Sequence, residues 1–533
     1  MRRNRCIPRS ILAAAAFLSL QAPAALAQEA PDKELVIAVT SLDLEIHPHH
    51  SIYAQEAQIL SGLYEGLFSY NPATLEPVRA AIRSFSRSRD GKTYTFYLRE
   101  TARWSNGDRV TAAHFRDAWL RMMDPAVKAD YGSFFDIIAG ARDYRAGRSR
   151  DTSKVGVSAI SEDVLQVTLE SPAPWFTKLL CHHSFSPVHP SVLGVRDWLS
   201  RAASVPYNGA FRIESVGPEG FTLRKNEAYW DADSVRLPGI RVVAPESPEE
   251  ASRLFNNGAV HWLAGDVDLE SILYRDAIQV NPMFATHYWF FSCRSAPWSD
   301  PAVRRALALL APWDEIRSRE QYLIPATGLV LPVEGYEAPA GIREPKPHAA
   351  RALLESAGYP DGKGLPALRI LLPEGEGAVR VAGLLSKAWK EALGLEMVVK
   401  TLPASRFYGS LRGADWDLTL NTWIGDFADP LAFLQMWTSD SSLNDAGYSD
   451  PDYDRRIAES SSLEGEDRMK ALSAAEGVLL DSGTVLPIYH SLAVNVVDTD
   501  IVEGWYSNAL DMHPFKYMRV GSPKALPNLV LAD

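Results

Sequence analysis

The chain has 533 residues, of which 46% are hydrophobic and 23% charged, with 54 basic and 66 acidic side chains. This length allows a few domains, and the composition is typical of a globular protein with a large core, which excludes disorder, collagen-like repeats and disulfide-stapled miniproteins. The net charge of -12 argues against nucleic acid and against an anionic membrane surface, because binding to either needs a surplus of Lys and Arg.

The first 27 residues predict a cleaved secretory signal. Four arginines accompany an apolar run, Ile11 to Leu20, that is too short to span a bilayer. Residues 25–27 read Ala-Leu-Ala, which are small enough for signal peptidase. A lipoprotein would need a cysteine directly after the cut, and Gln28 stands there, so we expect a freely diffusing protein. No other stretch has the roughly 20 apolar residues of a membrane helix, so we expect no stable membrane insertion.

Helix and strand signals alternate along the rest of the chain without a low-complexity linker, which predicts interleaved domains. Glu34 to Val39 predicts a short apolar strand. Ser88 to Leu98 predicts a hairpin, because Asp90-Gly91 allows the positive φ angles of a tight turn. Thr111 is the expected N-cap of an amphipathic helix that ends before Pro125.

The two cysteines outside the signal, Cys181 and Cys293, are interpreted as two buried thiols, although a secreted protein could join them in a disulfide. Further along the chain, Asp300-Pro301 and Asp450-Pro451 each predict a cap and a first helical residue. Helices are also expected at residues 348–357 and 379–393, with strands at 164–169, 221–223, 367–372 and 396–399. This alternation predicts an α/β lobe with a largely parallel sheet.

The sequence contains no recognisable catalytic motif. The nucleophile elbow Gly-x-Ser-x-Gly, the zinc motif His-Glu-x-x-His, the phosphate loop and the dinucleotide fingerprint are all missing. A hydrolase that uses two carboxylates leaves no local motif, because its two acids can come from any part of the chain. A secreted carboxylate-dependent hydrolase therefore stays open as an alternative.

Histidines gather at two places, first at His47, His49 and His50 and later at His182 and His183. Imidazoles at such spacing can share a transition metal. No cysteine or third-shell carboxylate stands at ligand spacing beside them. We therefore interpret the first group as a solvated loop after Pro48 and predict neither a metal site nor a cofactor.

Residues 421–430 concentrate the aromatic and polar side chains that line ligand pockets. The apolar alternation at residues 416–420 predicts a strand, so residues 423–426 should lie on the loop at its carboxyl end, where open α/β sheets bind ligands. On pattern alone, Asp426 is better explained as a loop acid facing water. Asp429 before Pro430 is interpreted as the cap of a helix over residues 431–437.

Motifs in one order along nearly the whole chain resemble a known family. They include Tyr64-Glu65-Gly66-Leu67, Asp90 to Phe96, Trp104-Ser105-Asn106-Gly107, Asn208-Gly209-Ala210-Phe211, Tyr229-Trp230, Pro297 to Ala306, Trp423 to Pro430, and Tyr453-Asp454. These segments are similar to the family 5 extracellular solute-binding proteins, the oligopeptide-binding and dipeptide-binding components of ATP-driven import systems.

The resemblance implies an α/β, bilobal periplasmic binding protein fold of type II, cluster C, with an extra subdomain on the first lobe. It places lobe I at residues 28–64, 191–285 and 490–533, the extra subdomain at 65–190, and lobe II at 286–489. It further implies a periplasmic monomer, not an enzyme, that binds peptides and delivers them to an inner-membrane ABC permease with its ATPase subunits. Family relatives also carry oligosaccharides, opines, nickel complexes or haem, and a chaperone-like or signalling use of the same fold stays open.

By the same resemblance, Asp426, three residues after Trp423, receives the amino terminus of the peptide. A carboxylate there would offset the desolvation of a buried ammonium. Leu420 stands where relatives can carry an arginine for the carboxyl terminus of a short peptide, so the length of the ligand stays open. The candidate ligand-binding residues are Tyr53, Tyr131, Trp423, Gly425, Asp426, Phe427 and His490.

Overall fold

The computed structural model describes residues 33–521 except 43, 52, 196–198, 319–322, 334, 412, 414 and 426. The predicted signal and Asp426 lie outside these residues. The chain divides into two units, Met1–Pro31 and Asp32–Asp533, and every described element belongs to the second.

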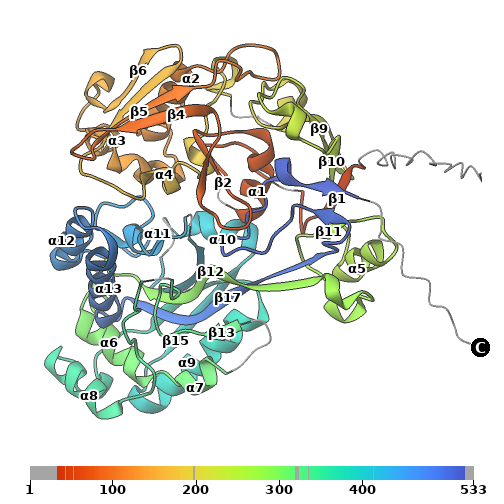
Figure 1. Cartoon of the computed structure of the whole chain (residues 1–533). Coiled ribbons are helices and arrows are strands. Elements are labelled where there is room, and N and C mark those ends of the chain that lie inside the picture. The colour runs from red at the N-terminus through yellow and green to blue at the C-terminus, as the bar shows by residue number, and fades with distance from the viewer. Residues whose placement is uncertain are drawn as a thin grey trace, which may run out of the picture. The chain divides into compact units, whose positions relative to one another are not determined.

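Within the described residues, eleven strands form one mixed sheet in the order β15-β14-β16-β12-β17-β11-β1-β10-β9-β8, with β13 also paired to β17. Its longest members are β12 (Ile278–Phe291) and β17 (Val485–Val497), which run antiparallel to each other near the middle of Figure 1. The other strands are β1 (Leu35–Ala38), β8 (Phe211–Gly217), β9 (Gly220–Lys225), β10 (Gly239–Val243), β11 (Trp262–Leu263), β13 (Leu323–Pro325), β14 (Leu368–Pro373), β15 (Met397–Leu402) and β16 (Leu418–Ile424).

The expectation of a largely parallel sheet in the second half of the chain is wrong, because the strand directions are mixed. The strands β14 and β15 are parallel, as expected for strands joined by a crossover helix, here α9 (Glu376–Leu393). The neighbours of β12 are β16 and β17, which come from much later in the chain, and both run antiparallel to it. No helical crossover joins β12 to either neighbour within the sheet, so the parallel direction is not imposed there.

A separate antiparallel sheet has the order β4-β5-β7-β6. It confirms the predicted hairpin, in which β4 (Ile82–Arg87) and β5 (Thr93–Leu98) are joined by a turn where Gly91 has φ 71°. The helix α2 (Ala112–Met123) follows Thr111 as predicted and packs with the sheet through the buried Phe115 and Trp119. The two remaining strands are β6 (Val157–Ser161) and β7 (Val164–Thr168), and Figure 1 shows the group in orange at the top.

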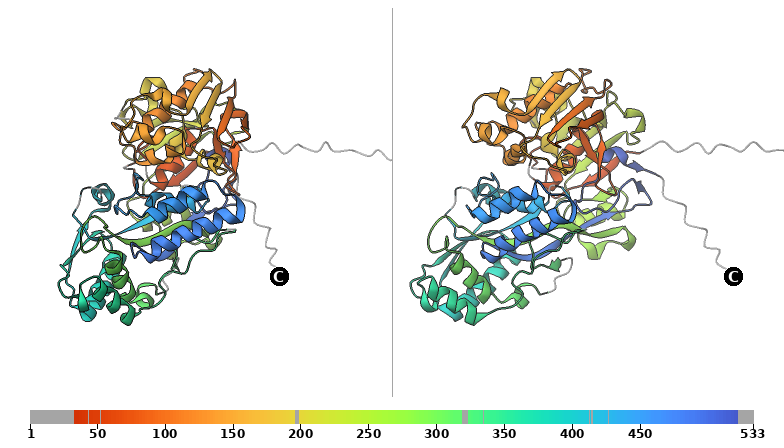
Figure 2. Two further views of the ribbon diagram at one scale, coloured as in Figure 1. Left: turned by 90° about the vertical axis from the view of Figure 1, so that its left-hand side faces the viewer. Right: turned by 60° about the vertical axis from the view of Figure 1, so that its left-hand side comes forward.

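The helices confirm most of the predicted caps. The carboxylate of Asp300 accepts a hydrogen bond from the Ala302 amide at 2.8 Å and begins α6 (Pro301–Leu310). Helices α6, α8 and α9 lie together beyond the large sheet, on the side away from the four-stranded sheet (Figures 1 and 2). The other helices are α1 (Ala54–Leu63), α3 (Ala141–Arg145), α4 (Phe176–Leu179), α5 (Pro248–Asn256), α7 (Trp313–Ile316), α8 (Pro347–Ser356), α10 (Ala404–Ser410), α11 (Leu431–Leu434), α12 (Pro451–Ser460) and α13 (Gly465–Asp481).

Two short strand pairs complete the fold: β2 (Phe68–Tyr70) with β3 (Pro77–Arg79), and β18 (Val502–Glu503) with β19 (Arg519–Val520). Cys181 and Cys293 are both free thiols. Among the described residues, no helix has both the length and the apolar character of a membrane span.

Candidate ligand-binding site

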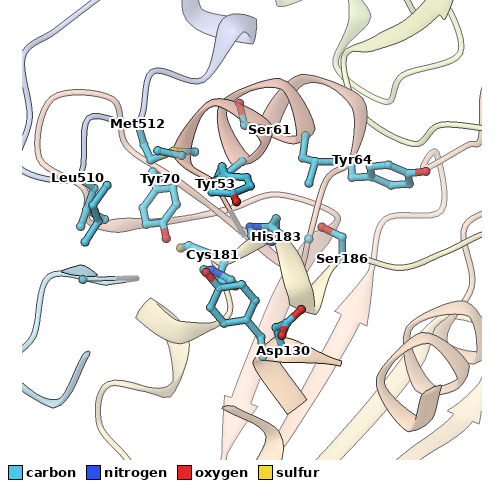
Figure 3. A pocket seen from close by; sticks show the side chains of 18 of the residues that line it. Tyr53, Ser61, Tyr64, Tyr70, Asp130, Cys181, His183, Ser186, Leu510 and Met512 are labelled. Atoms are coloured by element: carbon cyan, nitrogen blue, oxygen red, sulfur yellow. The ribbon is translucent and has the colours of Figure 1, made fainter. Parts of the chain in front are cut away.

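A cavity of about 580 Å³ is lined by residues from widely separated parts of the chain. One wall comes from α1, the residue before it and the segment that follows, including Tyr53, Ser61 and Tyr64, as Figure 3 shows. Other parts of the lining are the segment from Cys181 to Ser186, the end of β16, and residues between Leu510 and Lys516. Because these segments meet only in the folded chain, most of the lining could not be assembled from sequence spacing.

Aromatic rings form much of the cavity wall. Tyr53 meets Tyr408 edge to face, with ring centroids 6.3 Å apart. Tyr131, which lies in the short 3₁₀ segment Asp130–Ile137, packs against the ring of His182 at 4.6 Å. Faces of this kind contact varied apolar groups without selecting one shape, while the phenol groups supply polar contacts.

The structure brings together four of the seven candidate residues. Tyr53, Tyr131, Trp423 and Gly425 line the cavity. Phe427 does not and is fully buried in the core. His490 is buried on β17, where its Nδ1 atom lies 2.9 Å from Thr286 Oγ1 and outside the lining. Asp426 lies outside the described residues, and a ligand contact by any of the seven remains a prediction.

The loop expected at Trp423 is a strand. The strand β16 continues to Ile424, because β12 pairs with it as far as Ala285. The indole of Trp423 donates a hydrogen bond to the Ala432 carbonyl at 3.0 Å, which fixes the orientation of the ring. At Gly425 a Cβ atom would lie 2.4 Å from the Phe284 ring, so the chain passes this point only without a side chain.

A buried ion pair in the cavity wall was not predicted. Lys516 Nζ donates to Glu65 Oε1 at 2.7 Å, and the Tyr229 hydroxyl donates to the same oxygen at 2.6 Å. The indole of Trp230 donates to the second carboxylate oxygen. Burial opposes the charge of Lys516, but Glu65 keeps its pKa above the usual value. The partners are 451 positions apart, so no local signal could have found them.

Two further carboxylates, Asp130 and Asp445, line the cavity and were also missed by sequence reasoning. Arg294 donates to the Asp445 carbonyl at 2.6 Å, which fixes the backbone there. Together with the aromatic faces, these acids make the cavity suited to an organic ligand that carries a positive charge.

Two of the three histidines around Pro48, His47 and His49, are buried and His50 is half-buried, so the expectation of a solvated loop is wrong. His47 and His49 are 1% and 2% exposed, and the Nδ1 atom of His47 accepts a hydrogen bond from the His49 amide at 3.0 Å. His183 Nε2 lies 3.1 Å from the Ser51 carbonyl, which joins the two histidine groups. This contact could not be predicted from local sequence, because the partners are 132 positions apart. Among the described residues, no three His, Cys, Asp or Glu side chains are placed to hold a metal ion.

The buried histidines predict a loss of stability in acid. Burial lowers the pKa of both His47 and His182 from 6.5 to about 3, and it places the pKa of His49 well below the ordinary value. The unfolded chain therefore binds protons that the folded chain cannot, so stability is full above pH 6.5 and falls as the pH drops toward 3. At pH 5 each such imidazole costs about 2 kcal/mol of folding free energy.

Denaturant unfolding at pH 7.5 and pH 5.0 measures this effect. His49→Phe removes one titrating ring. Between pH 7.5 and pH 5.0, the free energy of unfolding of this variant should therefore fall by about 2 kcal/mol less than that of the wild type. The control is His348→Gln on the exposed surface of α8. Its free energy of unfolding should fall by as much as that of the wild type. An equal loss in all three proteins would contradict the assignment to the buried rings.

Comparison with known proteins supports the fold. Residues 76–445 match the family described as bacterial extracellular solute-binding proteins, family 5 Middle. The oligopeptide-binding protein OppA of Bacillus subtilis is 27% identical over 476 residues, covering 85% of this chain and 87% of that protein. The probable deoxycholate-binding periplasmic protein YgiS of Escherichia coli is 28% identical over 464 residues, covering 83% and 85%.

Among solved structures, the crystal structure of Haemophilus influenzae OppA in complex with RPPGFSPFR is similar to this chain with a TM-score of 0.81. The two sequences are 25% identical, and the match covers 93% of this chain and 100% of that one. The predicted α/β periplasmic binding protein fold of type II is therefore confirmed.

Proposed function

The chain belongs to the family 5 bacterial extracellular solute-binding proteins, and from this we propose that it binds peptides in the cavity and delivers them to an ATP-driven permease. The family consists of binding proteins, and two similar proteins are an oligopeptide-binding protein and an OppA in complex with the peptide RPPGFSPFR.

The edge of β16 is the observation that carries the proposal. On one side β16 pairs with β12 from Leu418 to Ile424. On the other side, within the described part of the chain, β14 pairs with it only at Leu418. Residues 421–425 line the cavity, so an extended peptide can add its backbone to this edge. Pairing through the main chain gives affinity that does not depend on side-chain sequence.

We also propose that the chain is a carrier and not a hydrolase. The carboxylate of Glu65, the most buried acid of the cavity wall, is held by Lys516, Tyr229 and Trp230. A general acid or base must exchange protons with a reacting group, and these donors occupy both of its oxygens. This supports a structural role for Glu65.

The remaining parts of the proposal are a periplasmic location after cleavage of the signal, a monomeric state, and an inner-membrane permease with its ATPase subunits as partner. We propose the lobe boundaries at residues 64, 190, 285 and 489, with 65–190 as the extra subdomain. The long strands β12 and β17 then join the two lobes, and their pairing shifts register between Pro282 and Thr286, where an irregular ladder can bend.

Native mass spectrometry of freshly purified protein tests the choice of ligand. A ladder of peptide masses, lost on mild denaturation, is expected. A single steroid-like mass would point to the ligand class named for YgiS, and a sugar, haem or metal mass would point to other cargoes of the family. Each of those results would overturn the peptide proposal.

Closure around the ligand is expected, because a carrier whose two lobes meet on the ligand stabilises the closed state through differential affinity. Small-angle scattering should give a smaller radius of gyration in saturating peptide than in buffer. A peptide that binds by calorimetry but leaves the radius unchanged would remove the hinge from the proposal.

A further inference from the structure

A buried ion pair lies at the end of the stretch from Trp423 to Asp429, which is called the ligand segment here because the ligand is proposed to bind along it. Both nitrogens at the end of the Arg468 side chain donate to the Asp429 carboxylate, at 2.7 and 2.8 Å. The side chains of Arg468 and Asp429 are only 5% and 8% exposed. Asp429 also accepts a hydrogen bond from the Leu431 amide at 3.0 Å, so it anchors the chain where the segment from Trp423 passes into α11. Arg468 on α13 thereby fixes the far end of this segment.

A tryptophan from the proposed extra subdomain covers the same arginine. The guanidinium carbon of Arg468 lies 4.2 Å from the ring centroid of Trp175, which stands just before α4 and is 5% exposed. The Nε atom of Arg468 is buried and has no hydrogen-bond partner among the described residues. A cation over an indole face is attracted most strongly when both are desolvated, as here. In Figure 1, α4 lies toward α11 and α13, in agreement with this contact.

A second contact joins the same two parts of the chain at the surface. Arg142 on α3 forms an ion pair with Asp440 at 2.7 Å. Arg145, one turn later, donates to the Asp440 carbonyl at 3.2 Å and is itself held by Asp136. Asp440 lies in the stretch between α11 and α12 that also supplies Leu443 and Asp445 to the cavity.

We propose that Trp175 and Arg468 form a clasp between the extra subdomain and lobe II, supported by Arg142 and Asp440, and that Arg468 is a positioning residue for the ligand segment. The inference rests on the proposed function and adds residues that act without touching the ligand, since none of these four lines the cavity. The clasp exists only when the lobes are closed. It therefore raises affinity by raising the fraction of the protein in the closed state.

Removing the clasp should weaken binding through faster dissociation. For Trp175→Leu we expect the dissociation constant for a tight peptide to rise about 10- to 30-fold, the effect of losing a desolvated cation–π contact. For Arg142→Ala we expect a rise of about 2- to 5-fold at low salt that fades at high salt, because this pair is exposed. The association rate should change little in either variant, since the open cavity keeps all of its ligand contacts.

The matched control is Arg148→Ala, which breaks an exposed pair with Asp143 at 2.7 Å inside the extra subdomain. Stopped-flow kinetics on the four full-length proteins separates the rates, and small-angle scattering at saturating peptide reports closure. Thermal unfolding identifies any loss of folding in Trp175→Leu, in which case the exposed Arg142→Ala variant decides. Unchanged dissociation rates in Trp175→Leu and Arg142→Ala, or an equal increase in Arg148→Ala, would overturn the clasp.

Failure of the proposed function gives a different result. If calorimetry shows that the wild type binds no peptide, the proposed function fails and the clasp that rests on it fails with it. If the wild type binds peptide but Trp175→Leu and Arg142→Ala dissociate at the wild-type rate, the clasp alone is rejected.

Discussion

Replacing Asp426 by asparagine is expected to weaken the binding of a peptide with a free amino terminus by about two to three orders of magnitude or more. This corresponds to about 3 to 5 kcal/mol, the loss when one partner of a buried charge pair is removed. The substitution keeps the size of the side chain but leaves a desolvated ammonium without a counter-charge. The prediction follows from the family resemblance and from the neighbours Trp423 and Gly425, which line the cavity.

Calorimetry with two proteins and two ligands isolates this interaction. Acetylating the peptide removes the ammonium, so it should weaken binding to the wild type far more than binding to Asp426→Asn. The control Asp445→Asn changes a carboxylate of the cavity wall by the same chemistry. If the large coupling energy appears with Asp445→Asn instead, the amino terminus of the peptide binds at Asp445. A coupling energy near zero for both variants would mean that neither carboxylate binds the ammonium, and the electrostatic argument for a peptide ligand would fail.

The parts of the fold that could be predicted depend on chemistry between residues close in sequence. The hairpin at Asp90-Gly91 and the cap at Asp300 follow from backbone preferences that act within a few residues. The helix before Gly394 ends where predicted, because this glycine adopts a left-handed conformation with φ 67°. The type II fold was predicted through family motifs, since no local rule gives the order of an eleven-stranded sheet.

The site was harder to predict because its members meet across long separations. The sequence predicts a loop at Trp423, since the pattern of β16 alone does not reveal that β12 extends the pairing to Ile424. His47 and His49 are polar side chains, yet they are buried in a region where contacts such as that between His183 and the Ser51 carbonyl hold the chain. In both cases the tertiary partner overrides the local signal, and a single sequence does not contain the partner's position.

Asp429 combines a local role that was predicted with a distant one that was not. Its carboxylate accepts from the Leu431 amide, as expected of a cap, although the residue directly before α11 is Pro430. The sequence did not indicate that the same carboxylate meets Arg468, 39 positions later, in the core. If Asp429 acted only as a cap, Asp429→Asn should change the free energy of unfolding little, because asparagine caps helices about as well as aspartate. Because the pair is buried, we instead expect a loss of about 3 to 5 kcal/mol in the free energy of unfolding.

Denaturant unfolding of two matched variants distinguishes the cap from the ion pair. Asp300→Asn changes an equivalent Asp-Pro cap, where the carboxylate accepts from the Ala302 amide at 2.8 Å, and should lose less than about 1 kcal/mol. In the Asp429→Asn background, Arg468→Met removes the unpaired cation and should restore part of the lost stability, although alone it is destabilising. Equal small losses at Asp300 and Asp429, or additive losses at Asp429 and Arg468, would mean that solvent reaches the pair and that Arg468 does not hold the ligand segment.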